Sequence, residues 1–111
     1  MSIMMPKDKV IYNLGPLQRI PVGEGRSFRV EATMIAIFRT RRNEVFATQA
    51  NCPHKGGPLA DGILGDGKIV CPLHTYKFQL ATGEALGHTC GSLTTYPVSV
   101  DENGNVLLYL E

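Results

Sequence analysis

The fold of this chain is decided by two short segments, Cys52-Pro53-His54 and, after sixteen intervening residues, Cys71-Pro72-Leu73-His74. Each segment offers one thiolate and one imidazole, two or three residues apart, beside a proline that fixes a backbone torsion. Two Cys and two His divided equally between two loops suit two metal ions better than one. In such a site one iron takes both thiolates and the other takes both imidazoles.

A single four-coordinate zinc is the alternative, because zinc also accepts two Cys and two His. Zinc fingers usually place both Cys in one knuckle and both His in another, whereas each loop is mixed here. Under the zinc alternative the chain would be a metal-stabilised interaction domain without a redox role. We therefore predict a 2Fe–2S cluster whose ligands are Cys52, His54, Cys71 and His74.

This ligand set resembles that of a Rieske 2Fe–2S protein, and the Gly56-Gly57-Pro58 after the first His adds to the resemblance. The resemblance implies an all-β, Rieske-type antiparallel sandwich or barrel with a small inserted cluster-binding subdomain. Rieske proteins of the respiratory cytochrome complexes carry a further Cys in each ligand loop, joined as a disulfide. At the matching positions this chain has Gly57 and Leu73. It therefore resembles the soluble Rieske proteins, which lack that bridge.

Within that class the chain looks most like the small subunit of assimilatory NAD(P)H nitrite reductase. The similarity spans Val10–Leu110 and is carried by the residues at 52–62, 71–74, 90–91 and 95–98. It implies an electron-transfer component that is not catalytic alone, with a large partner subunit carrying flavin, an iron–sulfur cluster and sirohaem. The alternative is a Rieske-type ferredoxin that passes electrons from a reductase to an oxygenase.

Length and composition limit the remaining possibilities. A chain of 111 residues predicts a single domain over 1–111, and no stretch approaches the ~18 consecutive apolar residues of a membrane span. The N-terminus lacks the pattern of a signal peptide, and Cys90 is left without a partner, so we expect a reducing, cytoplasmic setting and no membrane partner. A net charge of +1 gives no sign of a nucleic-acid partner.

Positive charge is concentrated in the first half of the chain. Residues 1–50 hold eight Lys and Arg against four Asp and Glu, whereas residues 51–111 hold three against six. The densest run is Arg39-Thr40-Arg41-Arg42. We predict that it forms the solvated turn of a hairpin; a docking patch for an acidic redox partner is the alternative.

Short runs of β-branched and aromatic residues separated by turns predict an antiparallel all-β framework. The expected strands cover residues 27–30, 34–40, 44–50, 95–100 and 106–110, with turns at 41–43 and 101–104. The last turn contains Asn103-Gly104, a strong hairpin signal. Tyr96, Val98 and Val100 alternate along one expected strand and should share a face.

A second small sheet is expected within about residues 51–91, the cluster-binding subdomain. A strand at 68–70 would lead to Cys71, and a strand at 76–80 would leave His74 and end in a turn at 81–84.

Four further residues of this subdomain carry expectations. Gly56 and Gly57 should let the backbone approach the cluster and point their amides at sulfur; plain turn-making is the alternative, and both roles can hold together. His88 is expected in a surface loop and Cys90 as a small buried thiol. We predict no catalytic residue in the isolated chain.

Overall fold

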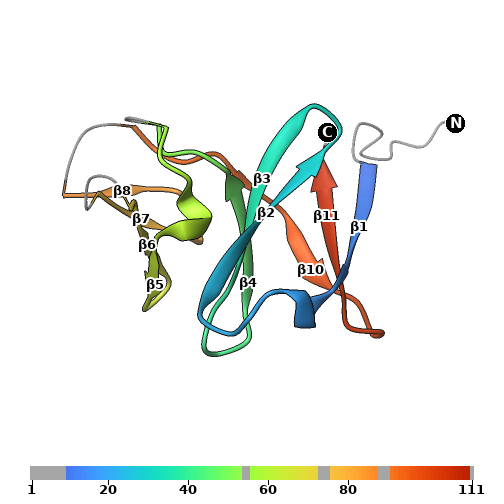
Figure 1. Ribbon diagram of the computed structural model, residues 1–111. Helices are drawn as coiled ribbons and strands as arrows, with labels where there is room; N and C mark the ends of the chain where they lie inside the picture. Colours follow the sequence, from blue (N-terminus) through green and yellow to red (C-terminus); the bar gives the residue numbers. More distant parts are fainter. Residues whose placement is uncertain (1–9, 54–55, 73–75, 88–90, 111) are drawn as a thin grey trace, which may run out of the picture.

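The computed structural model describes residues 10–53, 56–72, 76–87 and 91–110, and these form three antiparallel sheets arranged side by side (Figure 1). At one end lies the sheet with the order β1 (Val10–Pro16), β11 (Asn105–Leu110), β10 (Val98–Val100). The middle sheet has the order β2 (Glu24–Val30), β3 (Thr33–Arg39), β4 (Val45–Gln49), β9 (Thr95–Tyr96). The sheet at the other end has the order β5 (Ile63–Gly65), β6 (Lys68–Val70), β7 (Lys77–Gln79), β8 (Ala85–Leu86).

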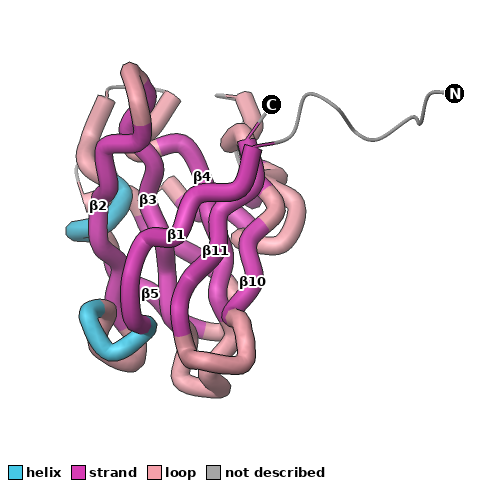
Figure 2. Tube along the Cα trace, turned by 90° about the vertical axis from the view of Figure 1, so that its right-hand side faces the viewer, coloured by secondary structure: helices cyan, strands magenta, loops and turns pink. Residues whose placement is uncertain are grey.

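Helical structure in the described residues is limited to two single turns of 3₁₀ helix, η1 (Leu17–Arg19) and η2 (Leu59–Asp61). Neither is long enough to cross a membrane. Figure 2 shows the first turn closing the end of β1, with the β1–β11–β10 sheet in front of β2, β3 and β4. The predicted all-β class is confirmed.

Strand β3 is the centre of the molecule because both of its faces are buried. Ile35 and Ile37 point to one side, and Ala36 and Phe38 point to the other, all with no exposed surface. Successive side chains of a strand face opposite ways, so a continuous apolar run places residues in two separate cores.

The first core joins the β1–β11–β10 sheet to the middle sheet. Its buried members are Ile20, Val30, Ile35, Ile37, Ala47, Val106 and Leu108. The second core joins the middle sheet to the β5–β8 sheet. Its buried members are Ala36, Phe38, Cys52, Leu59, Ile69, Cys71, Phe78, Leu80 and Leu93. Both predicted cysteine ligands therefore lie in the second core.

The prediction of one continuous strand over 95–100 is wrong, because the chain passes from the middle sheet to the β1–β11–β10 sheet at Pro97. Residues before it pair with β4, and residues after it pair with β11. Proline has no N–H for a sheet ladder, while the Pro97 carbonyl accepts the amide of Tyr109 at 3.0 Å. Tyr96 and Val98 still pack on the first core, and Val100 shares the face of Val98, opposite the buried Val106, although it is 37% exposed.

The other predicted strands and turns are confirmed with small shifts of their ends. The turn at 101–104 is closed by the Gly104 amide, which donates to the Asp101 carbonyl at 3.0 Å. Strand β6 has the predicted bounds, and β7 is shorter than the predicted 76–80. Strands β1, β5 and β8 were not predicted.

Candidate metal centre

Cys52 and Cys71 each begin a loop, and the two loops are closed by equivalent backbone hydrogen bonds. The amide of Cys52 donates to the carbonyl of Gly57, and the amide of Cys71 donates to the carbonyl of Tyr76, both at 2.8 Å. Each bond reaches five residues along the chain, so each cysteine is held at the base of a six-residue loop. The two sequence segments that looked alike thus share a local structure.

The two histidine ligands predicted from the sequence, His54 and His74, lie outside the described residues. The same holds for Leu73 and Thr75, and for the two residues expected to have no catalytic role, His88 and Cys90. Their predicted places and roles stay predictions.

The first loop is fixed from outside by the residues that flank it. Asn51 and Pro58 form an isolated β-bridge, and the Asn51 side-chain amide donates to the Gly56 carbonyl at 2.8 Å. An Asn directly before a loop often bonds to nearby backbone. The position of Asn51 directly before the loop could therefore have predicted that it fixes the loop, a role that the sequence analysis missed.

The backbone conformation at position 56 favours glycine, and the prediction that the Gly56 amide points at sulfur is wrong. The φ of Gly56 is +74°, in the left-handed region that favours glycine. Its amide donates to the Cys52 carbonyl at 2.8 Å and is therefore already occupied. Gly56 shapes the turn that starts at Cys52 instead of supplying a donor to the cluster.

The second loop extends the β6–β7 hairpin. Val70 and Lys77 are the last directly opposed pair of this hairpin, and Cys71 and Tyr76 follow them. The predicted delivery of Cys71 by a short strand is confirmed.

Both cysteines are almost fully buried, with 2% of their surface exposed, and they belong to the same apolar cluster. Leu59, Ile69 and Phe78 are buried in that cluster with them. A pair of thiolates there would be costly without a cation, because burying unpaired charge is unfavourable. Metal binding removes that cost, since thiolate ligands are held deprotonated by the metal. The described part of the site therefore fits an iron held by two thiolates.

The basic run forms the turn between β3 and β4, as predicted, and one of its arginines is structural. Arg39 donates to the Ile20 carbonyl at 2.9 Å and to the side chain of Asn43 at 2.8 Å. The Thr40 hydroxyl oxygen accepts the amides of Arg42 and Glu44 at 3.3 and 3.0 Å.

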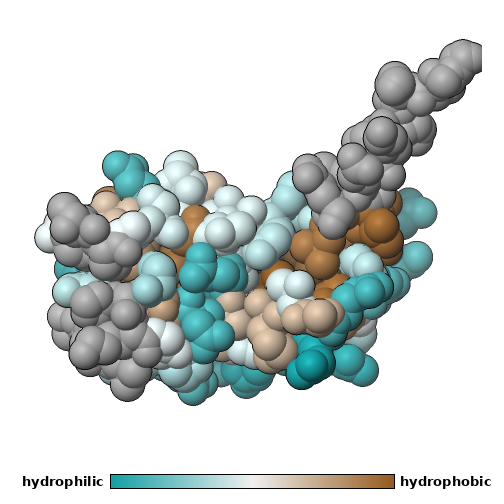
Figure 3. All heavy atoms as spheres, turned by 90° about the horizontal axis from the view of Figure 1, so that it is seen from above, coloured by the Kyte–Doolittle hydropathy of each residue, from teal (hydrophilic) through white to brown (hydrophobic). Residues whose placement is uncertain are grey.

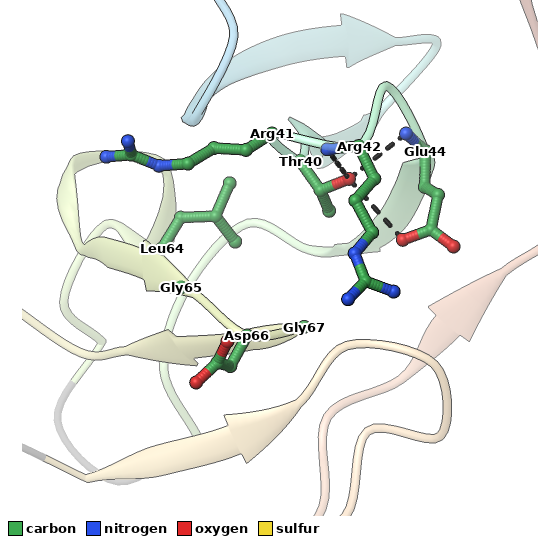
Figure 4. A pocket seen from close by; sticks show the side chains of 8 residues that line it. All are labelled: Thr40, Arg41, Arg42, Glu44, Leu64, Gly65, Asp66 and Gly67. Carbon is green, nitrogen blue, oxygen red and sulfur yellow. Dashed lines mark hydrogen bonds between the residues drawn. The ribbon is translucent and has the colours of Figure 1, made fainter.

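Arg41 and Arg42 line a cleft of about 440 Å³ between this turn and the turn from β5 to β6 (Figure 4). Glu44 and Asp66 lie in the same cleft, so its formal charge is balanced. The β5–β6 turn is at the opposite end of β6 from Cys71. The cleft is therefore not part of the metal centre.

Comparison with known proteins identifies the family. Residues 11–109 match the family described as Rieske-like [2Fe-2S] domain. This chain belongs to that family. Its match to the ferredoxin component of the naphthalene 1,2-dioxygenase/salicylate 5-hydroxylase systems from Ralstonia sp has 37% identity over 99 residues. That match covers 86% of this chain and 90% of the relative.

Two solved structures are similar over nearly their whole length. One is described as an NADH-dependent nitrite reductase small subunit from Mycobacterium tuberculosis. It has 22% identity and a TM-score of 0.86, with 93% of this chain and 96% of that one covered. The other is the ferredoxin of carbazole 1,9a-dioxygenase from Nocardioides aromaticivorans IC177. It has 25% identity and a TM-score of 0.80, with 88% and 95% covered.

These comparisons confirm the family predicted from the ligand spacing, the Rieske 2Fe–2S cofactor and a role in electron transfer. They favour the ferredoxin alternative over the nitrite reductase small subunit, because the dioxygenase ferredoxins are closer in sequence. The relatives are described as a component of dioxygenase and hydroxylase systems and as the small subunit of a reductase.

Proposed function

We propose that this chain is a Rieske-type ferredoxin that carries electrons from a reductase to an oxygenase. The observation that carries the proposal is the sequence identity to the Ralstonia dioxygenase ferredoxin component, which extends over most of both chains. The second candidate function is that of the small subunit of an NAD(P)H nitrite reductase. It is supported by the shared fold, which covers almost all of the similar Mycobacterium tuberculosis protein.

The cluster would be held by four residues of the two loops. Cys52 and Cys71 would bind one iron through their thiolates, and His54 and His74 would bind the other through imidazole nitrogens. When bound, the cluster supplies one-electron transfer. The chain itself contributes the buried position of Cys52 and Cys71, which would keep water away from an iron bound there.

The mixed ligand set makes the site easier to reduce than a site of four cysteines. Two ferric ions, two sulfides and two thiolates sum to zero charge, and neutral His adds none. An added electron then leaves a single negative charge, which costs less than adding it to an already anionic site. The potential is accordingly raised relative to plant-type ferredoxins.

The partners in this proposal are a ferredoxin reductase and a Rieske oxygenase. The chain would act as a single domain over 1–111 in the cytoplasm, where its odd number of cysteines suits a reducing compartment. Catalysis would reside in the oxygenase.

Electron transfer between purified proteins tests the proposal. The dithionite-reduced holoprotein is mixed in a stopped-flow instrument with an oxidised naphthalene dioxygenase oxygenase component. A parallel experiment uses the oxidised large subunit of an NAD(P)H nitrite reductase. We expect rapid reoxidation by the oxygenase and slow reoxidation by the nitrite reductase. Reoxidation by the nitrite reductase alone, or by neither protein, would overturn the ferredoxin proposal.

A further inference from the structure

The β5–β8 sheet carries two rows of directly opposed residues, one on each face. The inner row is Leu64, Ile69, Phe78 and Ala85, which pair in that order across the four strands. All four belong to the second core or pack against it. The neighbouring row is Ile63, Val70, Lys77 and Leu86, also directly opposed across the four strands. We call this second set the outer row.

The outer row faces away from the protein core. Successive residues of a strand alternate between faces, so burial of the inner row turns the outer row outward. Ile63 is 73% exposed, more than any other large apolar residue in the described part of the chain. All four outer-row residues line one shallow groove of about 530 Å³. Three of the four are apolar, although the solvent face of an antiparallel sheet is normally polar.

The outer row is directly joined to the loop that holds a predicted iron ligand. The hydrogen bond from the Cys71 amide to the Tyr76 carbonyl closes that loop. Val70 directly precedes Cys71, and Lys77 directly follows Tyr76. Neighbouring Cα atoms are ~3.8 Å apart. A protein seated on the outer row would thus lie beside the cluster-binding loop, where electron transfer has a short path.

The charges around the groove specify the chemistry of what would bind. Among the described residues that line it, Lys68 and Lys77 face one carboxylate, Asp66, so this part of the lining has a net positive charge. The wider segment from 51 to 91 has equal numbers of Lys and acidic residues. An apolar surface bordered by carboxylates would complement this groove, because its apolar part would pack on the outer row and its carboxylates would lie near the lysines.

We propose that the outer row is the docking surface for the oxygenase, seating an apolar patch with an acidic rim beside the second ligand loop. This inference rests on the proposed ferredoxin function and adds to it a surface and a partner chemistry. Four strands at ~4.8 Å spacing give a row about 14 Å wide. Such a row forms one part of a small interface, as is usual for transient redox encounters.

Exposed apolar residues also occur at the opposite end of the molecule and supply a matched control. Val10 and Ile11 of β1 are 49% and 57% exposed, and Figure 3 shows hydrophobic surface at this end. They lie in the sheet farthest from the ligand loops (Figure 1). Ile11 has the same side chain as Ile63, and both are on edge strands.

The test compares Ile63→Glu with Ile11→Glu in the reoxidation experiment described above, over a range of oxygenase concentrations. Each variant is first checked for unchanged iron content and reduction potential. We expect Ile63→Glu to raise the oxygenase concentration needed for half-maximal rate by about tenfold, as at an interface anchor. The maximal rate at saturating oxygenase should be unchanged, and Ile11→Glu should behave as wild type. Lys77→Gln should weaken the dependence of the rate on salt.

The outcomes separate this inference from the proposed function. Wild-type transfer to the oxygenase with no difference between Ile63→Glu and Ile11→Glu overturns the docking surface and leaves the function standing. Failure of wild-type transfer to the oxygenase overturns the function, and with it the proposed occupant of the surface. The variants are then compared with nitrite reductase as acceptor. A selective loss for Ile63→Glu there would assign the outer row to that partner instead.

Discussion

Gly62→Ala should disturb the cluster site without changing any ligand. Gly62 follows η2 and has φ −78° and ψ −177°, a conformation that alanine adopts without strain. A Cβ at this position would stand 2.2 Å from the Val70 carbonyl oxygen, whereas real Cβ contacts are essentially never under 3.0 Å. The two backbone segments would have to separate by roughly the 0.8 Å difference between those values.

That separation acts on both halves of the site. Gly62 belongs to the segment that continues from the first ligand loop, and Val70 immediately precedes Cys71. Functional constellations must be held within ~0.5 Å, so a shift of this size should impair cluster assembly. Overpacking typically costs about 1–3 kcal/mol, which for a domain of this size lowers Tm by roughly 5–15 °C.

Thermal unfolding by circular dichroism, together with iron and sulfide analysis, measures both effects. Gly65→Ala is the matched control, because no described atom lies within 4 Å of its added Cβ and it lies three residues further along, at the end of β5. We expect Gly65→Ala to retain the wild-type Tm and iron content. The steric reasoning is wrong if Gly62→Ala is as stable and as fully loaded as that control.

Four more predictions concern the ligands, the partners, the potential and one ionisable pair. His54→Ala should lose the cluster or its Rieske-type paramagnetic spectrum, whereas His88→Ala should keep both; iron analysis and electron paramagnetic resonance distinguish them. The isolated holoprotein should not reduce nitrite with NAD(P)H, because hydride acceptance needs a flavin; turnover in a nitrite assay would contradict this. The potential should lie nearer ~−150 mV than +300 mV, because the sequence lacks the loop disulfide of high-potential relatives. A voltammetric midpoint well above zero would show that donors such as the Thr75 hydroxyl had been underestimated. The Tyr12 hydroxyl donates to Glu31 at 2.8 Å, which raises the Tyr12 pKa above 10.0. This contact therefore favours the folded state fully below pH 10 and stops doing so as pH rises through the raised pKa; Glu31→Gln should lower the pKa in an ultraviolet titration.

The sequence predicted the parts of the fold that depend on local pattern. The ligand spacing led to the family, and the Asn103-Gly104 turn led to the β10–β11 hairpin. The β-branched and aromatic residues over 34–40 led to strand β3. These features are encoded within a few residues, so no knowledge of distant contacts is needed to recognise them.

The missed features depend on contacts between distant segments or on very short strands. Strand β1 pairs with β11 at the far end of the sequence, and its register shifts between Asn13 and Pro16. Strands β5 and β8 have three and two residues, too few to show a clear period. Asp66-Gly67 could have predicted the β5–β6 hairpin, since both residues have positive φ, as a two-residue turn requires.

The structure also explains how the two predicted ligand loops can differ in sequence and still place their cysteines in one core. Each loop is closed beneath its cysteine by a bond between main-chain atoms, which most residue types can form. Each cysteine is then placed against the same core, where Phe38 and Phe78 are completely buried. The relative placement of the two cysteines therefore depends on how the two segments pack, and the lack of a Cβ at Gly62 allows the segment after the first loop a close contact with the Val70 carbonyl. Changes within a loop act locally, whereas changes at that contact act on both thiolates at once.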